Sequence, residues 1–189
     1  MKLSRIFATV TVTAALLAGA APRASAFELS LTDVLGQPVR IAAATRAPTI
    51  IFFMSKSAKE ASAAFAKAID ERLVDKPIDS IGIVDVRRYS GILRGVCTRY
   101  LKRSAEESKV KRRERRQARG VDATPTAVDR WHLVGDFDGS LFARFGVEAE
   151  PKQPLAFVVD CTGTLRGPFR DVEPVVAAAT SPSANSAGR

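Results

Sequence analysis

The stretch that decides the fold is Thr49-Ile-Ile-Phe-Phe-Met-Ser-Lys-Ser-Ala-Lys-Glu60. Its first half is a nearly continuous apolar run of strand length, which is typical of a central strand covered on both faces. From Ser57 to about Val74 the apolar residues follow a helical period, and its core positions are Ala61, Phe65, Ile69 and Leu73. We therefore predict a buried strand that passes directly into a helix.

Further strands and helices alternate along the rest of the chain. The pattern predicts a hairpin from residues 27–31 and 38–41, strands over 81–86 and 131–134, a long helix from about Gly91, a short helix over 141–145, a second hairpin from 155–160 and 164–168, and a last helix over 172–179. Helices alternating with strands that end in an antiparallel pair indicate an α/β fold. We expect a mixed sheet with helices on both faces and an N-terminal β-hairpin.

The N-terminal segment has the features of a secretory signal. Lys2 and Arg5 precede a largely apolar stretch, and Ala24-Ser25-Ala26 is a typical cleavage site. We predict a signal peptide over 1–26 cleaved after Ala26, one domain over 27–179, and a disordered tail over 180–189. No later apolar run has the about 18 residues that a transmembrane helix needs. The sequence therefore predicts a periplasmic or secreted bacterial protein without a transmembrane helix.

The positive charge gathers in one segment. Removal of the leader, which carries Lys2, Arg5 and Arg23 and no acidic residue, lowers the net charge from +9 to +6, while residues 99–119 contain ten Lys or Arg against three Glu, a net of +7. The apolar stripe fades after Ala105, so we predict that residues 102–119 form a basic helical extension that projects into solvent or frays.

This extension is either a solvated helix end or a surface for an anionic partner, such as lipid or the phosphates of lipopolysaccharide. An unidentified protein partner is also compatible with the sequence. No aromatic residue lies within 109–119, so base stacking on nucleic acid is not supported. The candidate binding residues are Lys109, Lys111, Arg112, Arg113, Arg115 and Arg116.

Three motifs in this order resemble the thioredoxin-like fold, in particular its peroxiredoxin (AhpC/TSA-like) and TlpA-like branch. They are FELSLTDVLGQPV at 27–39, DFDGSLFARFGV at 136–147 and QPLAFVVDCTG at 153–163. A closer resemblance is to the exported YtfJ family of the same fold, which shares the helix start Ser57-Ala-Lys-Glu60, a junction without cysteine and a long charged second helix. The resemblance implies a periplasmic thioredoxin-like protein.

In redox-active members of this fold, the strand-to-helix junction carries a cysteine whose thiolate the helix N-terminus stabilises. This chain has Ser55 and Ser57 there, and a protonated hydroxyl cannot form a disulfide. We predict that Ser57 or Ser55 caps the helix, with Glu60 completing a capping box. The resemblance also implies that Pro154 is a cis-proline facing the junction; an ordinary trans-proline is the alternative.

The chain has two cysteines and no CxxC motif. Cys97 shares an apolar helix face with Leu93, Val96, Tyr100 and Leu101, so we expect a buried, inert thiol. Cys161 lies in a hairpin turn and should be more exposed. A structural disulfide between them is one possibility, and two unpaired thiols are the other.

No metal and no cofactor is expected. His132 is the only histidine, which excludes the usual clusters of His and Cys ligands, and Asp136 and Asp138 are best explained as turn residues. Our leading hypothesis is an exported thioredoxin-like domain without redox catalysis that acts by binding a protein or an anionic surface. The alternative is a divergent thiol oxidoreductase or peroxiredoxin-like antioxidant protein that uses Cys97 or Cys161.

Overall fold

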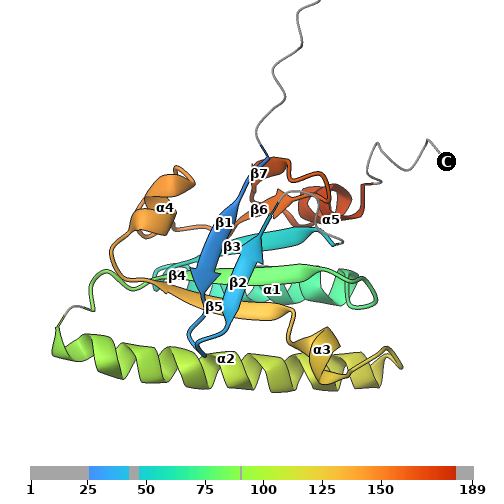
Figure 1. Cartoon of the computed structure of the whole chain (residues 1–189), viewed down its shortest axis with the longest axis horizontal. Coiled ribbons are helices and arrows are strands. Elements are labelled where there is room, and N and C mark those ends of the chain that lie inside the picture. The colour runs from blue at the N-terminus through green and yellow to red at the C-terminus, as the bar shows by residue number, and fades with distance from the viewer. Residues whose placement is uncertain (1–25, 43–46, 90, 182–189) are drawn as a thin grey trace, which may run out of the picture.

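A five-stranded mixed sheet forms the centre of the computed structural model, which describes residues 26–42, 47–89 and 91–181 (Figure 1). The strand order is β5-β4-β3-β6-β7. The strands are β3 (Thr49–Met54), β4 (Asp79–Asp85), β5 (Trp131–Asp136), β6 (Leu155–Val159) and β7 (Leu165–Phe169). The pairs β3–β4 and β4–β5 are parallel, whereas β3–β6 and β6–β7 are antiparallel. The apolar run Thr49–Met54 is therefore β3, the central strand of the sheet.

Two further strands and five helices complete the described part of the chain. They are the antiparallel hairpin β1 (Leu29–Thr32) and β2 (Pro38–Ile41), then α1 (Lys59–Arg72), α2 (Ile92–Ala118), α3 (Pro125–Val128), α4 (Ser140–Arg144) and α5 (Val172–Thr180). This arrangement confirms the predicted α/β class. Most of the predicted signal peptide and tail lies outside the described residues, although Thr180 belongs to α5. Within the described ranges, no helix has both the length and the hydropathy of a membrane span.

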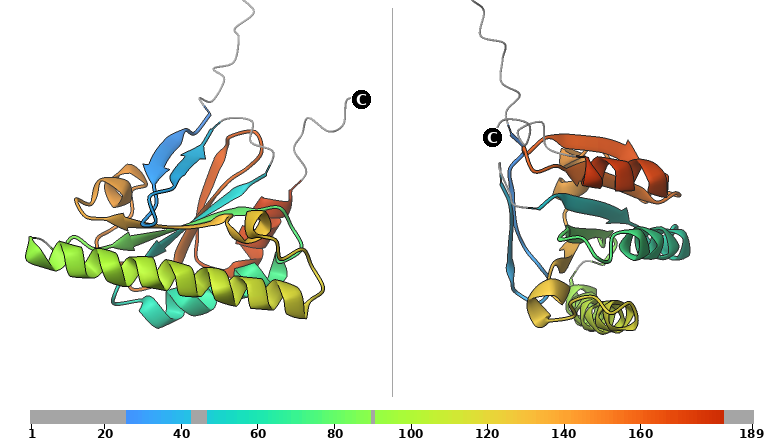
Figure 2. Two further views of the ribbon diagram at one scale, coloured as in Figure 1. Left: turned by 60° about the horizontal axis from the view of Figure 1, so that its bottom comes forward. Right: turned by 90° about the vertical axis from the view of Figure 1, so that its right-hand side faces the viewer.

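The two faces of the sheet are covered differently. Successive residues of a strand point to opposite faces, so Ile51 and Phe53 pack with the hairpin and α4, whereas Ile50 and Phe52 pack with α1 and α5. Figure 2 shows the hairpin on one side of the sheet and α1, α2 and α5 on the other. The second face therefore carries all the long helices.

Aromatic packing fixes the hairpin side. The ring of Phe53 lies 4.9 Å from that of Phe142, 5.0 Å from that of Phe145 and 5.7 Å from that of Phe157. The turn before α4 depends on the buried Asp136 carboxylate, which accepts hydrogen bonds from the backbone N–H groups of Gly139 and Phe142. This is the turn role predicted for Asp136.

The prediction that the basic segment projects into solvent is wrong. Helix α2 continues to Ala118, and the side chains of Arg112 and Arg116 are buried, with 5% and 6% of the residue surface exposed. The Arg116 guanidinium donates to the carbonyls of Val74 and Asp122. Arginine can pack its apolar stem while its planar head binds polar groups, so a helical segment without an apolar stripe can still be held against the domain.

Candidate functional site

The serines at the strand-to-helix junction bind the backbone, although not as predicted. Helix α1 begins at Lys59 with Ala58 as its N-cap and no side-chain cap, so the capping box of Ser57 and Glu60 is wrong. The buried Ser55 hydroxyl accepts a hydrogen bond from the Ala58 N–H at 3.2 Å and donates to the Pro151 carbonyl at 2.7 Å. Ser55 therefore links the strand-to-helix junction to the backbone at Pro151, and its hydroxyl proton is donated to the Pro151 carbonyl.

Ser57 is exposed, and its hydroxyl lies 3.0 Å from that of Ser55. The expectation of a cis-proline at position 154 is wrong, because Gly167–Pro168 is the cis peptide bond among the described residues. Pro154 immediately precedes β6, the antiparallel neighbour of β3. Sequence alone does not fix the isomer of an X–Pro bond, since the surrounding fold selects it.

Both cysteines are free in the structure, so the disulfide between Cys97 and Cys161 is not formed. Cys97 is buried on α2, as predicted, and burial raises the pKa of its thiol. Cys161 is partly exposed in the turn after β6. The described residues contain no group of three or more His, Cys, Asp or Glu that could hold a metal ion.

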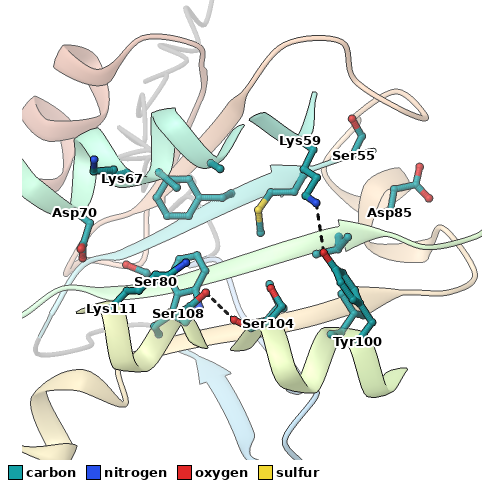
Figure 3. Close-up of a pocket in the computed structure, with 18 of the residues that line it drawn as sticks. Ser55, Lys59, Lys67, Asp70, Ser80, Asp85, Tyr100, Ser104, Ser108 and Lys111 are labelled. Carbon is teal, nitrogen blue, oxygen red and sulfur yellow. Dashed lines mark hydrogen bonds between the residues drawn. The ribbon is translucent and has the colours of Figure 1, made fainter. Parts of the chain in front are cut away.

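A large hollow lies between α1 and α2, over the sheet, and we call it the α1–α2 groove. Its volume is about 790 Å³, and one end adjoins Ser55 (Figure 3). Most of its lining is apolar. The floor includes Phe52, Met54, Trp131 and Leu133, the α1 wall includes Lys59, Ala63, Ala66 and Lys67, and the α2 wall includes Leu93, Val96, Tyr100, Ser104, Ser108 and Lys111.

A glycine shapes the floor of the groove. A Cβ atom at Gly82, in β4, would clash with the Met54 side-chain methyl and lie 3.0 Å from Leu133 Cδ1. Met54 can lie across β4 only because position 82 has no side chain. The groove therefore has a floor of long apolar side chains laid over a central strand.

Two polar bridges join the walls of the groove. At one end, the Lys59 ammonium lies 3.4 Å from the Tyr100 hydroxyl. At the other, the Asp70 carboxylate pairs with Arg115 at 2.6 Å and with Arg112 at 3.3 Å. In the described part of the chain, no hydrogen bond or ion pair joins α1 and α2 between these bridges. The helices are thus fastened at two points and separated between them.

The groove carries an excess of positive charge. Lys56, Lys59, Lys67 and Lys111 all line it. Its acidic residues are engaged by arginines: Asp70 as described above, and Asp85 by Arg87 at 2.6 Å, whose guanidinium hydrogen bonds hold the pKa of Asp85 below its ordinary value. The unneutralised charge of the lining is therefore mainly that of lysines.

The six basic residues that we predicted as a candidate anionic-binding surface do not share one exposed face. Arg112 and Arg116 are buried, Arg115 is paired with Asp70, and Lys109 pairs with Asp129 at 2.8 Å. Lys111 and Arg113 are exposed. Lys111, Arg112 and Arg115 line the α1–α2 groove. The sequence prediction placed these cations on an open surface, whereas three of them border a groove.

No model of a known protein family and no curated protein sequence matches this chain. Similar solved structures include a putative thiol-disulfide oxidoreductase from Bacteroides vulgatus, at 13% identity and a TM-score of 0.47 over 86% of this chain and 89% of that one. A putative thioredoxin from Neisseria meningitidis has 16% identity and a TM-score of 0.45 over 76% and 77%. The exposed lipoprotein thioredoxin Etrx1 from Streptococcus pneumoniae has 14% identity and a TM-score of 0.44 over 75% and 87%. These TM-scores are all below 0.5, so the assignment to the α/β class rests on the strand order and register of the sheet.

Proposed function

We propose that this chain is an exported thioredoxin-like binding protein of the YtfJ kind, without redox catalysis, and that the α1–α2 groove is its ligand site. One observation carries the proposal: a mainly apolar hollow of about 790 Å³ open beside α2. Sites for small ligands have volumes of about 300–1,000 Å³ and a mainly apolar lining with a few polar groups.

The α2 wall supports the same conclusion. Leu93, Val96 and Tyr100 line the groove and are 55%, 53% and 57% exposed. Gathered large apolar side chains at a surface commonly mark a binding site, because their exposure to water is unfavourable. A ligand in the groove would cover them.

The chemistry of a thiol oxidoreductase is less well supported. The junction offers Ser55 and Ser57, and the pKa of the Cys97 thiol is raised by burial, which disfavours the reactive thiolate. Insulin reduction and peroxide consumption by the purified protein should therefore not exceed the buffer rate. An activity that Cys161→Ser or Cys97→Ser abolishes would establish the rival function.

Binding itself is tested with N-phenyl-1-naphthylamine, an uncharged dye that fluoresces in apolar sites. Ala63 and Ala64 are neighbouring exposed residues of α1, but only Ala63 lines the groove. The wild type and Ala64→Phe should bind the dye equally, whereas Ala63→Phe, which places a ring in the groove, should bind about tenfold more weakly, a loss of about 1.4 kcal/mol. No binding by the folded wild type, or equal affinity of the two variants, would contradict the proposal.

A further inference from the structure

We propose that the α1–α2 groove holds a single-chain lipid with an anionic head group, of the fatty-acid class. This inference rests on the proposed binding function and names the ligand of that site. It follows from three properties of the groove: an apolar middle, a pair of lysines at one end, and polar bridges that limit the width of an occupant.

The apolar middle suits an alkyl chain. The floor is lined by Phe52, Met54 and Trp131, and between the two polar bridges the α1 wall has the small side chains of Ala63 and Ala66, which leave space above the floor. Leu93 and Val96 precede Tyr100 on one face of α2, so they extend the apolar lining past the Lys59–Tyr100 bridge. Transfer of methylene groups from water into such an environment is favourable in proportion to the area buried.

The lysine end suits an anion. Along the α2 wall the lining changes from apolar residues to Ser104 and Ser108 and then to Lys111, and Figure 3 shows Lys67 of α1 at the same end. The nearby acid, Asp70, already pairs with two arginines. Lys67 has one exposed ion pair, with Glu71 at 3.8 Å, and Lys111 has no ion pair among the described residues. Two ammonium groups are therefore available to a carboxylate head.

The polar bridges favour a thin ligand over a protein segment. An α-helix with its side chains is about 10–12 Å wide, so a helix lying in the groove would have to break the Lys59–Tyr100 contact and the Asp70 pairs. An extended peptide would need partners for its backbone N–H and C=O groups, but beneath the groove β4 is already paired on both edges. An alkyl chain needs no hydrogen bonds and can lie beneath the bridges.

Trp131, the only tryptophan of the chain, lies in the floor and reports on occupancy. Laurate, dodecyltrimethylammonium and octanoate, each below its micelle concentration, separate the contributions of head and tail. We expect laurate to shift the Trp131 emission to shorter wavelength and to displace N-phenyl-1-naphthylamine. Dodecyltrimethylammonium, with the same tail and a cationic head, and octanoate, with a shorter tail, should each bind at least about tenfold more weakly.

Charge reversal locates the head group. Lys67→Glu combined with Lys111→Glu should lower the laurate affinity about tenfold or more and raise that of dodecyltrimethylammonium. The control combines Lys102→Glu with Arg113→Glu, which changes the net charge equally at exposed positions outside the lining and should leave both affinities unchanged. Circular dichroism of each variant verifies its folding.

The failures are distinguishable. If the uncharged dye binds but laurate does not displace it, or if laurate and dodecyltrimethylammonium bind equally, the lipid assignment is overturned while the groove remains the binding site. Displacement of the dye by an acidic amphipathic helical peptide but not by laurate would also overturn the assignment, in favour of a protein ligand. If the folded protein binds neither dye nor laurate, the proposed function itself fails.

Discussion

The two halves of α2 contrast in a way that inverts the usual relation between polarity and burial. In the first half, Leu93, Val96 and Tyr100 are more than half exposed. In the second half, Arg112 and Arg116 are almost fully buried. The apolar stripe meets the groove, whereas the basic stretch packs against the end of α1.

The difference shows how one half of a helix can hold it against the domain while the other half keeps apolar side chains exposed. Arginines of the second half reach the Asp70 carboxylate and the Val74 carbonyl, so they hold α2 against the domain through polar contacts. In the first half, Cys97 and Leu101 are buried and also line the groove, while Leu93, Val96 and Tyr100 stay exposed. The attachment of one half therefore leaves the apolar side chains of the other available to a ligand.

The largest effect should come from Asp70→Ala. This change leaves the buried Arg112 without its acidic partner, and breaking a buried pair costs about 3–5 kcal/mol. Urea denaturation gives the free energy of unfolding, and Arg113→Ala, at an exposed position, should change it by less than about 0.5 kcal/mol. If Asp70→Ala changes the free energy of unfolding as little as Arg113→Ala does, the second half of α2 is not held to the domain by its buried arginines, which contradicts the contrast between the two halves.

Two leucines of the first half test which of its faces is buried. Leu101 is in the core, so Leu101→Ala should lower the free energy of unfolding by about 2–5 kcal/mol. Leu93→Ala removes an exposed side chain and should change it by less than about 0.5 kcal/mol, while weakening dye binding. Equal destabilisation by the two substitutions would mean that Leu93 is also a core residue.

The smallest effect concerns Asp85, which lies at the Tyr100 end of the groove (Figure 3). Hydrogen bonds from Arg87 hold the pKa of Asp85 below its ordinary 3.8. The stabilisation is therefore present above about pH 4 and lost as the pH falls through the lower pKa of the folded state. At neutral pH, Asp85→Asn should cost less than about 1 kcal/mol, and urea denaturation should show this difference shrinking below about pH 4. A difference that grows on acidification would have the wrong sign.

The sequence predicts the sheet well because its signals are local. The run at 49–54 corresponds to β3 to the residue, and the two predicted strands around the Asp160 turn correspond to β6 and β7 within one residue at each end. Consecutive apolar residues indicate a buried strand, and turn residues between two strands indicate a hairpin. Neither signal depends on distant parts of the chain.

The groove could not be predicted because its signals are long-range. Arg115 finds its partner Asp70 45 residues away, and nothing near Arg115 in the sequence identifies that partner. The pattern alone did not show that Leu93 is exposed while Leu101 is buried, since both lie on one broad apolar face of α2. The spacing of Leu93, Val96 and Tyr100 was the available signal, and only the three-dimensional arrangement of the described residues shows that these side chains stay exposed.

The most direct test of the groove as the ligand site is protection of Cys97, which lines it. In Cys161→Ser, Cys97 is the only thiol, and its reaction with N-ethylmaleimide can be followed by mass spectrometry. N-phenyl-1-naphthylamine at about ten times its Kd should slow this reaction about tenfold, while leaving the reaction of Cys161 in Cys97→Ser unchanged. Equal rates at Cys97 with and without bound dye would place the ligand elsewhere and contradict the account.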